Sequence, residues 1–233
     1  MKVTYIHHSS FCVELDHAAL IFDYTEGPWP DIDPKKTVVI FASHRHGDHF
    51  SPVIFEKARL YDDVRFVLSD DIWKKRVPEE LLERTSFVKP GAVLEIGEVP
   101  GMTVETFRST DEGVAFWVSC EGKTIYHAGD LNNWRWEEEP DPWNPNMDRK
   151  YHEELQKMSG RHADLAFLPL DPRQEQWFYL GMDEFLKSVD ADLIFPMHCW
   201  GDYSVIARMK QHPCSAAYRD RIVEIQHDGQ RLV

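Results

Sequence analysis

The sequence predicts an α+β fold, a four-layer αβ/βα sandwich in which two mixed β-sheets pack face to face with helices outside. Residues 3–68 alternate short apolar runs with turns and a helix, and residues 87–126 form a further series of apolar runs and turns, which implies a second sheet. Each half of the chain also supplies helices, so closing the two sheets on each other covers every apolar face. The 233 residues are enough for one domain over residues 1–233, which would bury about 70 to 75% of its unfolded surface.

Short apolar runs bounded by turn residues predict five strands in the first part of the chain, at residues 3–6, 11–15, 19–23, 37–42 and 64–68. The first three form a meander, with a turn at Asp16-His17. Ser51-Pro52 predicts the start of a helix through about residue 60, because serine caps helix N-termini and proline fits the first turn. Further helices are expected to begin at Asp70 and at Pro78.

The same signals predict the later strands, at residues 87–88, 93–96, 102–107, 114–119, 124–126, 163–168, 193–196 and 222–225. Helices are expected at residues 149–158 and 183–189, and one that begins at Tyr203.

The composition limits the classes of function. The formal net charge is −14, which argues against a nucleic-acid partner because polyanions are repelled at long range. No apolar run approaches the roughly 18 residues of a membrane span. The first residues lack the pattern of a secretion signal, and the four cysteines are scattered, as expected for reduced thiols in a cytoplasmic protein.

The densest group of ligand-type side chains follows the strand expected at residues 37–42. The loop at residues 43–49 has the spacing His-x-His-x-Asp-His, with His44, His46, Asp48 and His49. Neutral imidazole is the commonest metal ligand, and this spacing can send two histidines to one ion and the Asp-His pair to another. The alternative is a run of surface histidines after a strand, which requires a coincidence in both residue type and spacing.

Three motifs together resemble the metallo-β-lactamase fold superfamily. They are the loop at residues 43–49, His127-Ala128-Gly129-Asp130 and Pro196-Met197-His198, each after an expected strand. The chain is most similar to the branch of L-ascorbate-6-phosphate lactonase-like proteins, judging from the start His-Ser-Ser-Phe and the short helices. The resemblance covers nearly the whole chain and implies a dinuclear metallohydrolase. Two divalent ions are then expected, zinc first, with manganese or iron as alternatives.

The resemblance implies two ligand sets joined by one carboxylate: His44, His46 and Asp111 for the first ion, Asp48, His49 and His198 for the second, and Asp130 as the bridge. Asp111 departs from the family pattern, which usually has a histidine between the first loop and the Gly-Asp motif. The only histidine there is His127, beside Asp130. A carboxylate is an acceptable zinc ligand and suits manganese or iron, so we predict Asp111 in that place. If Asp111 merely caps a turn, His127 is the fallback ligand; otherwise it lies behind the ligands.

Further residues are expected around the metals. By resemblance, Asp23 supports the metal loop, and His8 lines the site unless it is a strand-end histidine bonded to the backbone. Arg173 could orient an anionic substrate group, although a solvated loop charge is the commoner role of such an arginine. Tyr203 either reaches into the pocket or only packs against other side chains.

Three tryptophans and three prolines occur within residues 131–145, directly after Asp130. A non-periodic segment of this kind is typical of a loop held by aromatic packing. Trp134 and its neighbours then form a lid or a wall of the substrate pocket. A dimer contact in a homo-oligomer and a surface loop packed on its own chain are alternatives.

These observations predict a metal-dependent hydrolase with a hydroxide shared by two ions and a small-molecule substrate, an ester, a lactone or a phosphoester. Asp48 is the expected catalytic proton acceptor. Three alternatives remain open: a phosphodiesterase or nuclease of the same superfamily, a redox di-iron protein, and a metal-binding protein without catalysis. The spacing does not select the bond that is cleaved.

Overall fold

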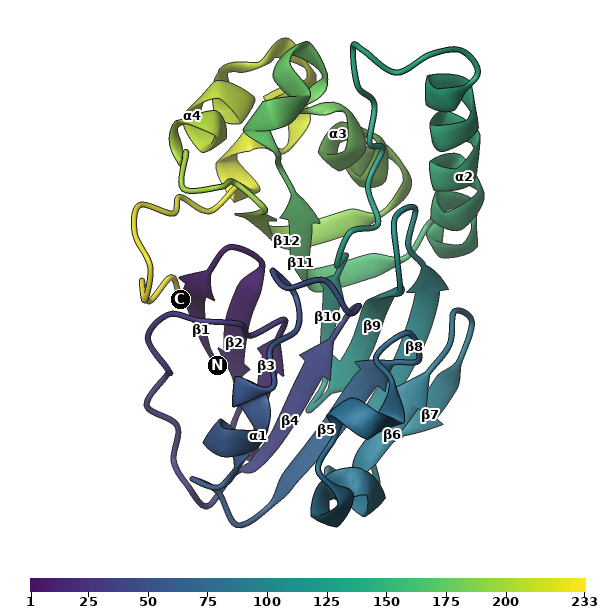
Figure 1. The fold of residues 1–233 in the computed structure, drawn as a ribbon. Helices are drawn as coiled ribbons and strands as arrows, with labels where there is room; N and C mark the ends of the chain where they lie inside the picture. The colour runs from purple at the N-terminus through teal and green to yellow at the C-terminus, as the bar shows by residue number, and fades with distance from the viewer.

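A computed structural model describes residues 1–233 and contains two six-stranded sheets (Figure 1). The first sheet has the strand order β1 to β6 and the second has the order β12 to β7. The strands are β1 (Lys2–His7), β2 (Ser10–Glu14), β3 (Ala18–Phe22), β4 (Thr37–Ala42), β5 (Val64–Ser69), β6 (Thr85–Val88), β7 (Val93–Glu95), β8 (Thr103–Arg108), β9 (Val114–Cys120), β10 (Lys123–His127), β11 (His162–Pro169) and β12 (Asp190–Met197).

Both sheets are mixed. Strands β1 to β3 form the expected antiparallel meander, and β3, β4, β5 and β6 then run parallel. In the second sheet, β7 to β10 are antiparallel, whereas β10, β11 and β12 are parallel. Parallel neighbours place their carboxyl ends at one edge, so the loops after β10, β11 and β12 emerge together.

The apolar runs are continuous because both faces of the first sheet are covered. In β4, Val39 and Phe41 belong to the core between the sheets, whereas Val38 and Ile40 belong to a second core that includes Ile54 of helix α1 (Val53–Ala58). The two sheets meet through aromatic pairs such as Phe41 with Phe116 of β9, whose ring centroids are 5.1 Å apart. Burying a phenylalanine side chain contributes about 1.5 to 3 kcal/mol.

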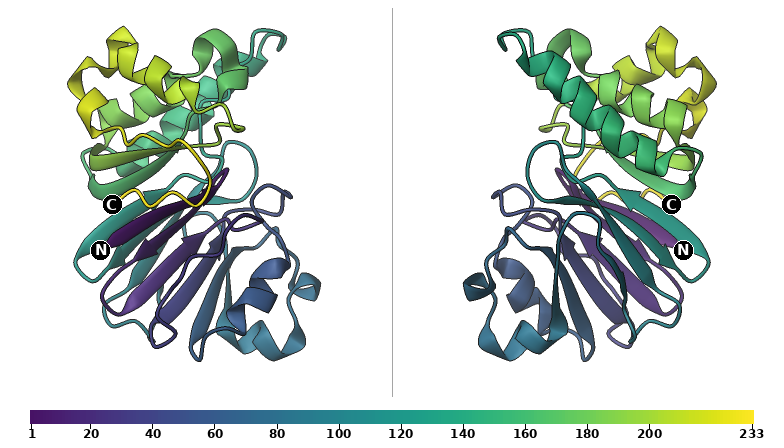
Figure 2. Two further views of the ribbon diagram at one scale, coloured as in Figure 1. Left: turned by 90° about the vertical axis from the view of Figure 1, so that its left-hand side faces the viewer. Right: turned by 90° about the vertical axis from the view of Figure 1, so that its right-hand side faces the viewer.

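The helices lie outside the two sheets, as predicted. Figure 2 shows α2, α3 and α4 over one sheet and α1 on the opposite side of the molecule. The helices are α1 (Val53–Ala58), α2 (Trp143–Met158), α3 (Leu180–Ser188) and α4 (Ser204–Gln211), with 3-10 turns at Lys74–Arg76, Glu79–Arg84, Pro172–Trp177, Pro213–Ala217 and Arg219–Arg221. None of the helices combines the length and the apolar character that a membrane crossing requires.

Four local predictions were wrong. β6, which covers the strand expected at residues 87–88, belongs to the first sheet, because it pairs with β5. No helix begins at Asp70, where the chain makes a turn before the 3-10 turn Lys74–Arg76. Residues 222–225 make a single bridge to Ile194 and no strand. α2 begins at Trp143, six residues earlier than expected, so the Trp/Pro-rich loop ends there.

Candidate metal centre

Asp23 holds the loop at residues 43–49 in place. Its carboxylate accepts hydrogen bonds from the N–H and the hydroxyl of Ser43, both at 2.7 Å, and from Nδ1 of His49 at 2.7 Å. Asp23 is fully buried, so these charge-assisted bonds lie in a region of low dielectric, where they are strong. The carboxylate therefore orients the ring of His49 and fixes the start of the loop, next to β4.

Two glycines let neighbouring segments approach this loop. A Cβ on Gly113 would lie 2.0 Å from the carbonyl oxygen of Ser43, and a Cβ on Gly129 would lie 2.6 Å from Cβ of Ser43. Both glycines have positive φ, which other residues rarely adopt. The turn that carries Asp111 and the loop that carries Asp130 can therefore pack directly against Ser43.

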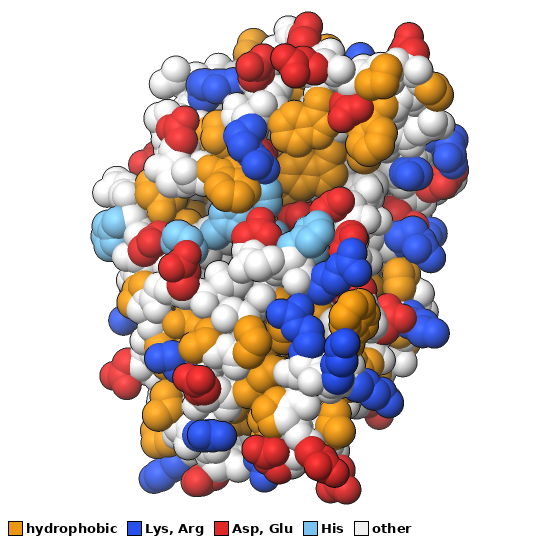
Figure 3. Space-filling view, in the orientation of Figure 1, with side chains coloured by type: hydrophobic (Ala, Val, Ile, Leu, Met, Phe, Trp, Pro, Cys, Tyr) orange, Lys and Arg blue, Asp and Glu red, His pale blue; other side chains and the backbone are white.

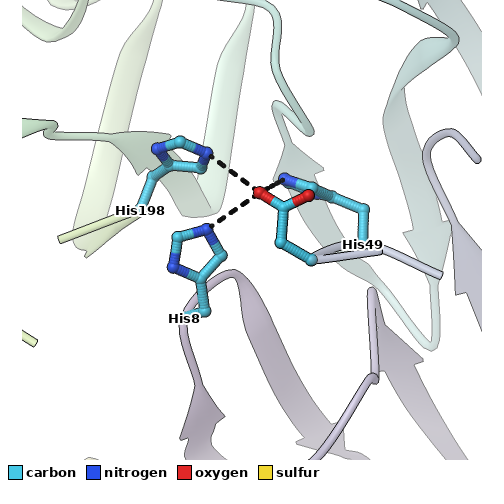
Figure 4. Close-up of side chains that lie close together, drawn as sticks. His8, His49 and His198 are labelled. Carbon is cyan, nitrogen blue, oxygen red and sulfur yellow. Dashed lines mark ion pairs between the residues drawn. The ribbon is translucent and has the colours of Figure 1, made fainter. Parts of the chain in front are cut away.

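Three histidines and an aspartate form the inner cluster: His8, Asp48, His49 and His198. Figure 4 shows the three imidazoles pointing toward one another from different parts of the chain. The donor atoms lie within 4.8 Å of one another. Oδ2 of Asp48 is 3.5 Å from Nε2 of His8 and 3.7 Å from Nε2 of both His49 and His198.

Two histidines and two aspartates form the outer cluster: His44, His46, Asp111 and Asp130. Nε2 of His44 is 3.5 Å from Oδ2 of Asp130, and Nδ1 of His46 is 3.5 Å from Oδ2 of Asp111. The turn around Asp111 is held by Ser109, whose hydroxyl accepts the N–H of Asp111 at 3.1 Å. The carboxylate of Asp111 faces His46 and makes no hydrogen bond to the turn.

Asp130 lies between the two clusters. Its Oδ2 faces His44, whereas its Oδ1 is 3.2 Å from Nε2 of His49 and 3.6 Å from Nε2 of His198. Nε2 of His8, Nε2 of His49 and Oδ1 of Asp130 are buried and have no hydrogen-bond partner. Buried polar atoms without partners are rare in native proteins unless a ligand or an ion engages them. The donor set therefore fits divalent cations, which would engage these orphaned atoms.

The pKa shifts follow from this crowding. Burial alone would lower the pKa of His49 and of His198, but the charge of Asp130 raises both together with a second carboxylate, Asp23 at His49 and Asp171 at His198. Burial would raise the pKa of Asp48, yet the nearby imidazoles of His198, His8 and His49 lower it well below its usual value. His44 differs, because burial and the nearby charge of His49 lower its pKa to about 4. Imidazoles and carboxylates are thus held as ion pairs where a cation can replace the protons.

Asp171 supports His198 from behind and was not among the residues singled out in the sequence. Its Oδ2 accepts hydrogen bonds from Nδ1 of His198 at 2.9 Å and from the indole N–H of Trp200 at 3.2 Å. Burial would raise the pKa of this carboxyl, but bonds from His198 and Arg173 lower it to about 2. The available signal was its place directly after β11, a strand whose carboxyl end lies beside that of β12.

Backbone strain gathers at the same place. His8, Asp23, His198 and Trp200 all have φ between 46° and 62°, a region that side chains larger than glycine occupy at a cost of about 1 to 3 kcal/mol each. Strain of this kind persists where the surrounding packing enforces it, and it is concentrated at functional sites.

Three other predicted residues lie around the clusters without joining them. His127 is buried, and its Nε2 donates to the carbonyl of Ser9 at 2.9 Å. Nε and Nη2 of Arg173 both bind the carboxylate of Asp171, at 2.6 to 3.0 Å. The hydroxyl of Tyr203 donates to Asp228 at 2.9 Å. His8, expected to be at most near the metals, lies within the inner cluster.

A cavity of about 390 Å³ opens over both clusters. Metal-ligand candidates and four tryptophans line it, and Figure 3 shows hydrophobic side chains next to histidines and acidic residues on this face. Its lining residues are His46, Asp48, Thr110, Asp111, Asp130, Trp134, Trp136, Trp143, Met147, Arg173, His198 and Trp200.

One family model and several named proteins match this chain. A family model described as "Beta-lactamase superfamily domain" matches residues 2–146. A protein of Opitutus terrae named "UPF0173 metal-dependent hydrolase" is 29% identical over 150 residues, which are 56% of this chain and 63% of that protein, under two thirds of its length. A protein of the same name from Bacillus pumilus is 28% identical over 237 residues, 91% of this chain and 90% of that protein.

A solved structure shares the fold over the full length. Igni18, described as a novel metallo hydrolase from Ignicoccus hospitalis, matches with a TM-score of 0.61 and 19% sequence identity, covering 99% of this chain and 97% of that protein. At this identity the likeness concerns the fold alone.

Proposed function

Because the chain belongs to the family described as the beta-lactamase superfamily domain, we propose that it is a metal-dependent hydrolase that uses two divalent ions on a small ester, lactone or phosphoester. The observation that carries this proposal is the pair of donor clusters that meet at Asp130, with buried donor atoms that lack protein partners. The cavity over the clusters gives a small substrate access to them.

The proposed ligands follow the two clusters. The inner cluster would hold one ion through His49, His198 and Asp48, with His8 close enough to join them. The outer cluster would hold the other through His44, His46 and Asp111, and Asp130 would contact both ions. Bound ions of this kind lower the pKa of a shared water and polarise the scissile carbonyl or phosphoryl group. Imidazole and carboxylate donors suit zinc, and manganese or iron are alternatives.

Residues of the chain orient the proposed ligands and transfer the proton of the attacking water. Asp48 lines the cavity, and its side chain is 31% exposed, so its carboxylate can reach a water above the clusters. We assign it the role of proton acceptor during attack and of proton donor to the leaving oxygen. Asp23 and Asp171 keep the rings of His49 and His198 oriented through their Nδ1 atoms.

The test combines metal content with hydrolysis. Elemental analysis of the metal-loaded protein should give about two ions per chain, and lactones, aryl esters and phosphodiesters should be assayed before and after His46→Ala. We expect the variant to lose activity by at least about 100-fold, because outer-cluster metal binding would fail. His162→Ala is the matched control, because His162 is an exposed histidine that pairs with Asp190 and Asp192. Equal activity of His46→Ala and wild type would refute the proposal.

Lactones are the first substrates to assay, because the His-Ser-Ser-Phe start resembles the L-ascorbate-6-phosphate lactonase-like branch. A reaction in the cytoplasm is part of the same proposal and fits the scattered thiols, three of which are buried.

A further inference from the structure

We infer that the substrate carries a planar apolar group without a negative charge, which binds against a wall of tryptophans over the metal centre; this rests on the proposed function. The tryptophan wall consists of Trp134, Trp136, Trp143 and Trp200. In Figure 3 the space-filling surface shows a hydrophobic patch directly beside the histidines and acidic residues of the site.

The wall is assembled from separate parts of the chain. Trp134 and Trp136 follow Asp130, Trp143 begins α2, and Trp200 follows His198. The rings of Trp134 and Trp136 are nearly parallel, with centroids 6.1 Å apart and an interplanar angle of 7°. The ring of Trp134 also lies 5.3 Å from that of His198. The aromatic surface therefore begins at the proposed metal ligands and extends outward along the cavity.

Hydrogen bonds hold the wall in shape. The indole N–H of Trp134 donates to the carbonyl of Asp130 at 2.8 Å, and Nε2 of Gln174 donates to the carbonyl of Asn133 at 2.8 Å. The amide of Asn133 also bridges Asp148 of α2 and Glu184 of α3, at 2.6 and 2.9 Å. A surface fixed in this way binds a flat group without first being ordered, which favours affinity.

Contacts within the chain leave about half of each outer ring uncovered. Trp143 is 45% exposed and Trp200 is 49% exposed, although large apolar side chains are normally covered. Exposed aromatic surface that lines a concave site is typical of a place where a ligand binds. Aromatic rings prefer to stack on or meet the edges of other rings, so a planar partner gains more here than a saturated one of equal size.

The charges around the wall disfavour an anionic group. Arg173 is the one arginine or lysine that lines the cavity, and its Nε and Nη2 are bound to Asp171 while its guanidinium lies 4.2 Å from the ring of Trp200. The adjoining hollow is lined by four acidic residues: Glu137, Glu138, Glu139 and Glu175. With a formal net charge of −14, the protein adds no long-range attraction for an anion.

A substrate series tests the inference. Dihydrocoumarin and octahydrocoumarin are lactones of nearly equal size, one with a planar benzene ring and one saturated, and phenyl acetate and 4-carboxyphenyl acetate differ by one negative charge. Each kcat/KM is divided by the rate constant for hydroxide hydrolysis of the same compound, which removes intrinsic reactivity. We expect the planar lactone to exceed the saturated one by at least about tenfold, and the carboxylate to lower kcat/KM by at least about fivefold.

Variants test whether the tryptophan wall causes the preference for planar substrates. In Trp136→Leu the planar-to-saturated ratio should fall toward one, whereas Trp136→Phe should keep most of it, because only the latter retains a ring. Trp73→Ala is the control, because Trp73 is 55% exposed and does not line the cavity. A wild-type ratio near one, or a ratio that Trp136→Leu leaves unchanged, would overturn the inference while hydrolysis itself stands.

A binding measurement separates this inference from the proposed function. Benzyl alcohol, cyclohexylmethanol and benzenesulfonate are titrated into the metal-loaded protein, and tryptophan fluorescence is followed. We expect benzyl alcohol to bind several-fold more tightly than the other two, and Trp136→Leu to remove that preference. If this preference is found but no substrate is hydrolysed, the proposed function fails and the binding site stands; if all three bind equally, the inference fails.

Discussion

The inner and the outer cluster contain the same kinds of side chain but differ in burial. In the inner cluster His8, His49 and His198 are 6%, 0% and 4% exposed and Asp48 is 31% exposed. In the outer cluster His44 and Asp130 are buried as well, but His46 and Asp111 are 41% and 45% exposed. A buried set of donors is fixed before an ion arrives, and an exposed set must be ordered by it. The comparison teaches that the two halves of the centre should differ in affinity, with the inner cluster binding its ion more tightly.

The supports of the two clusters differ in the same way. Asp23 and Asp171 are both 0% exposed and bind the inner histidines His49 and His198. In the outer cluster, His46 faces Glu112 at 3.4 Å, and this carboxylate is 32% exposed and also pairs with Arg45. Exposed ion pairs contribute roughly 0 to 1 kcal/mol, and breaking a buried one costs about 3 to 5 kcal/mol.

The largest effect is expected for Asp23→Asn, and it concerns the free energy of unfolding. The change keeps the size of the side chain and tolerates the positive φ of this position, but removes the charge that His49 and Ser43 share. We expect the free energy of unfolding, measured in urea, to fall by about 3 kcal/mol or more. Glu112→Gln is the matched change in the outer cluster and should cost less than about 1 kcal/mol. Equal losses in the two variants would break the comparison.

The next effect concerns metal retention. His198→Ala removes a buried donor of the inner cluster, and His46→Ala removes an exposed donor of the outer one. After dialysis against a moderate chelator, we expect His46→Ala to keep about one ion per chain and His198→Ala to keep well under one, since loss of one ligand weakens binding at least about 100-fold. Elemental analysis measures both. The reverse order would mean that burial does not set affinity here.

A smaller effect, on the zinc affinity of the outer cluster alone, is expected for Asp111→His. It places a histidine where the family usually has one, and zinc favours imidazole over a single carboxylate oxygen. We expect zinc affinity of the outer cluster to rise by about tenfold, with the inner cluster unchanged, in a competition titration with a chromophoric chelator. Manganese affinity should fall instead. No change for either metal would argue that Asp111 is not a ligand.

The smallest expected effect is a difference in the number of protons that the two clusters release when they bind ions. The pKa of His49 is raised well above its usual value and that of His198 is raised, so these rings keep their protons to higher pH than an ordinary imidazole, and a cation must displace them. The pKa of His44 is lowered to about 4, so this ring is neutral at pH 7 and releases none. Calorimetry in buffers of different ionisation enthalpy should therefore show more protons released when the inner ion binds than when the outer ion binds. Raising the pH above 8 should reduce the difference.

The predicted fold and family are confirmed, because they depend on a whole series of apolar runs and on motifs in a fixed order. The loop at residues 43–49, Asp130 and His198 all follow a strand, and strand ends at one edge of a sheet bring their side chains together. Residues 222–225 were misjudged because a short apolar run is also compatible with an irregular segment that makes a single bridge. The ligand roles themselves stay predictions.

Side-chain direction was the part that the sequence left open. His7 and His8 are adjacent, yet His7 pairs with Asp228 at the surface while His8 points into the inner cluster. A register shift between Tyr5 and His7 and the positive φ of His8 decide this, and neither follows from alternation. Trp200 was missed although it lies two residues after His198; an aromatic residue that close to a ligand motif is a usable signal.

The inner cluster draws on residues near both ends of the chain, from His8 to His198, whereas the outer cluster is contained within residues 44–130. During synthesis on the ribosome, domains assemble as the chain emerges. The four outer donors are therefore all available while the last hundred residues are still being made, but the inner site closes only after β12 has joined its sheet. In the proposed two-ion centre, the ion expected to bind more tightly would thus be the one whose site is completed last.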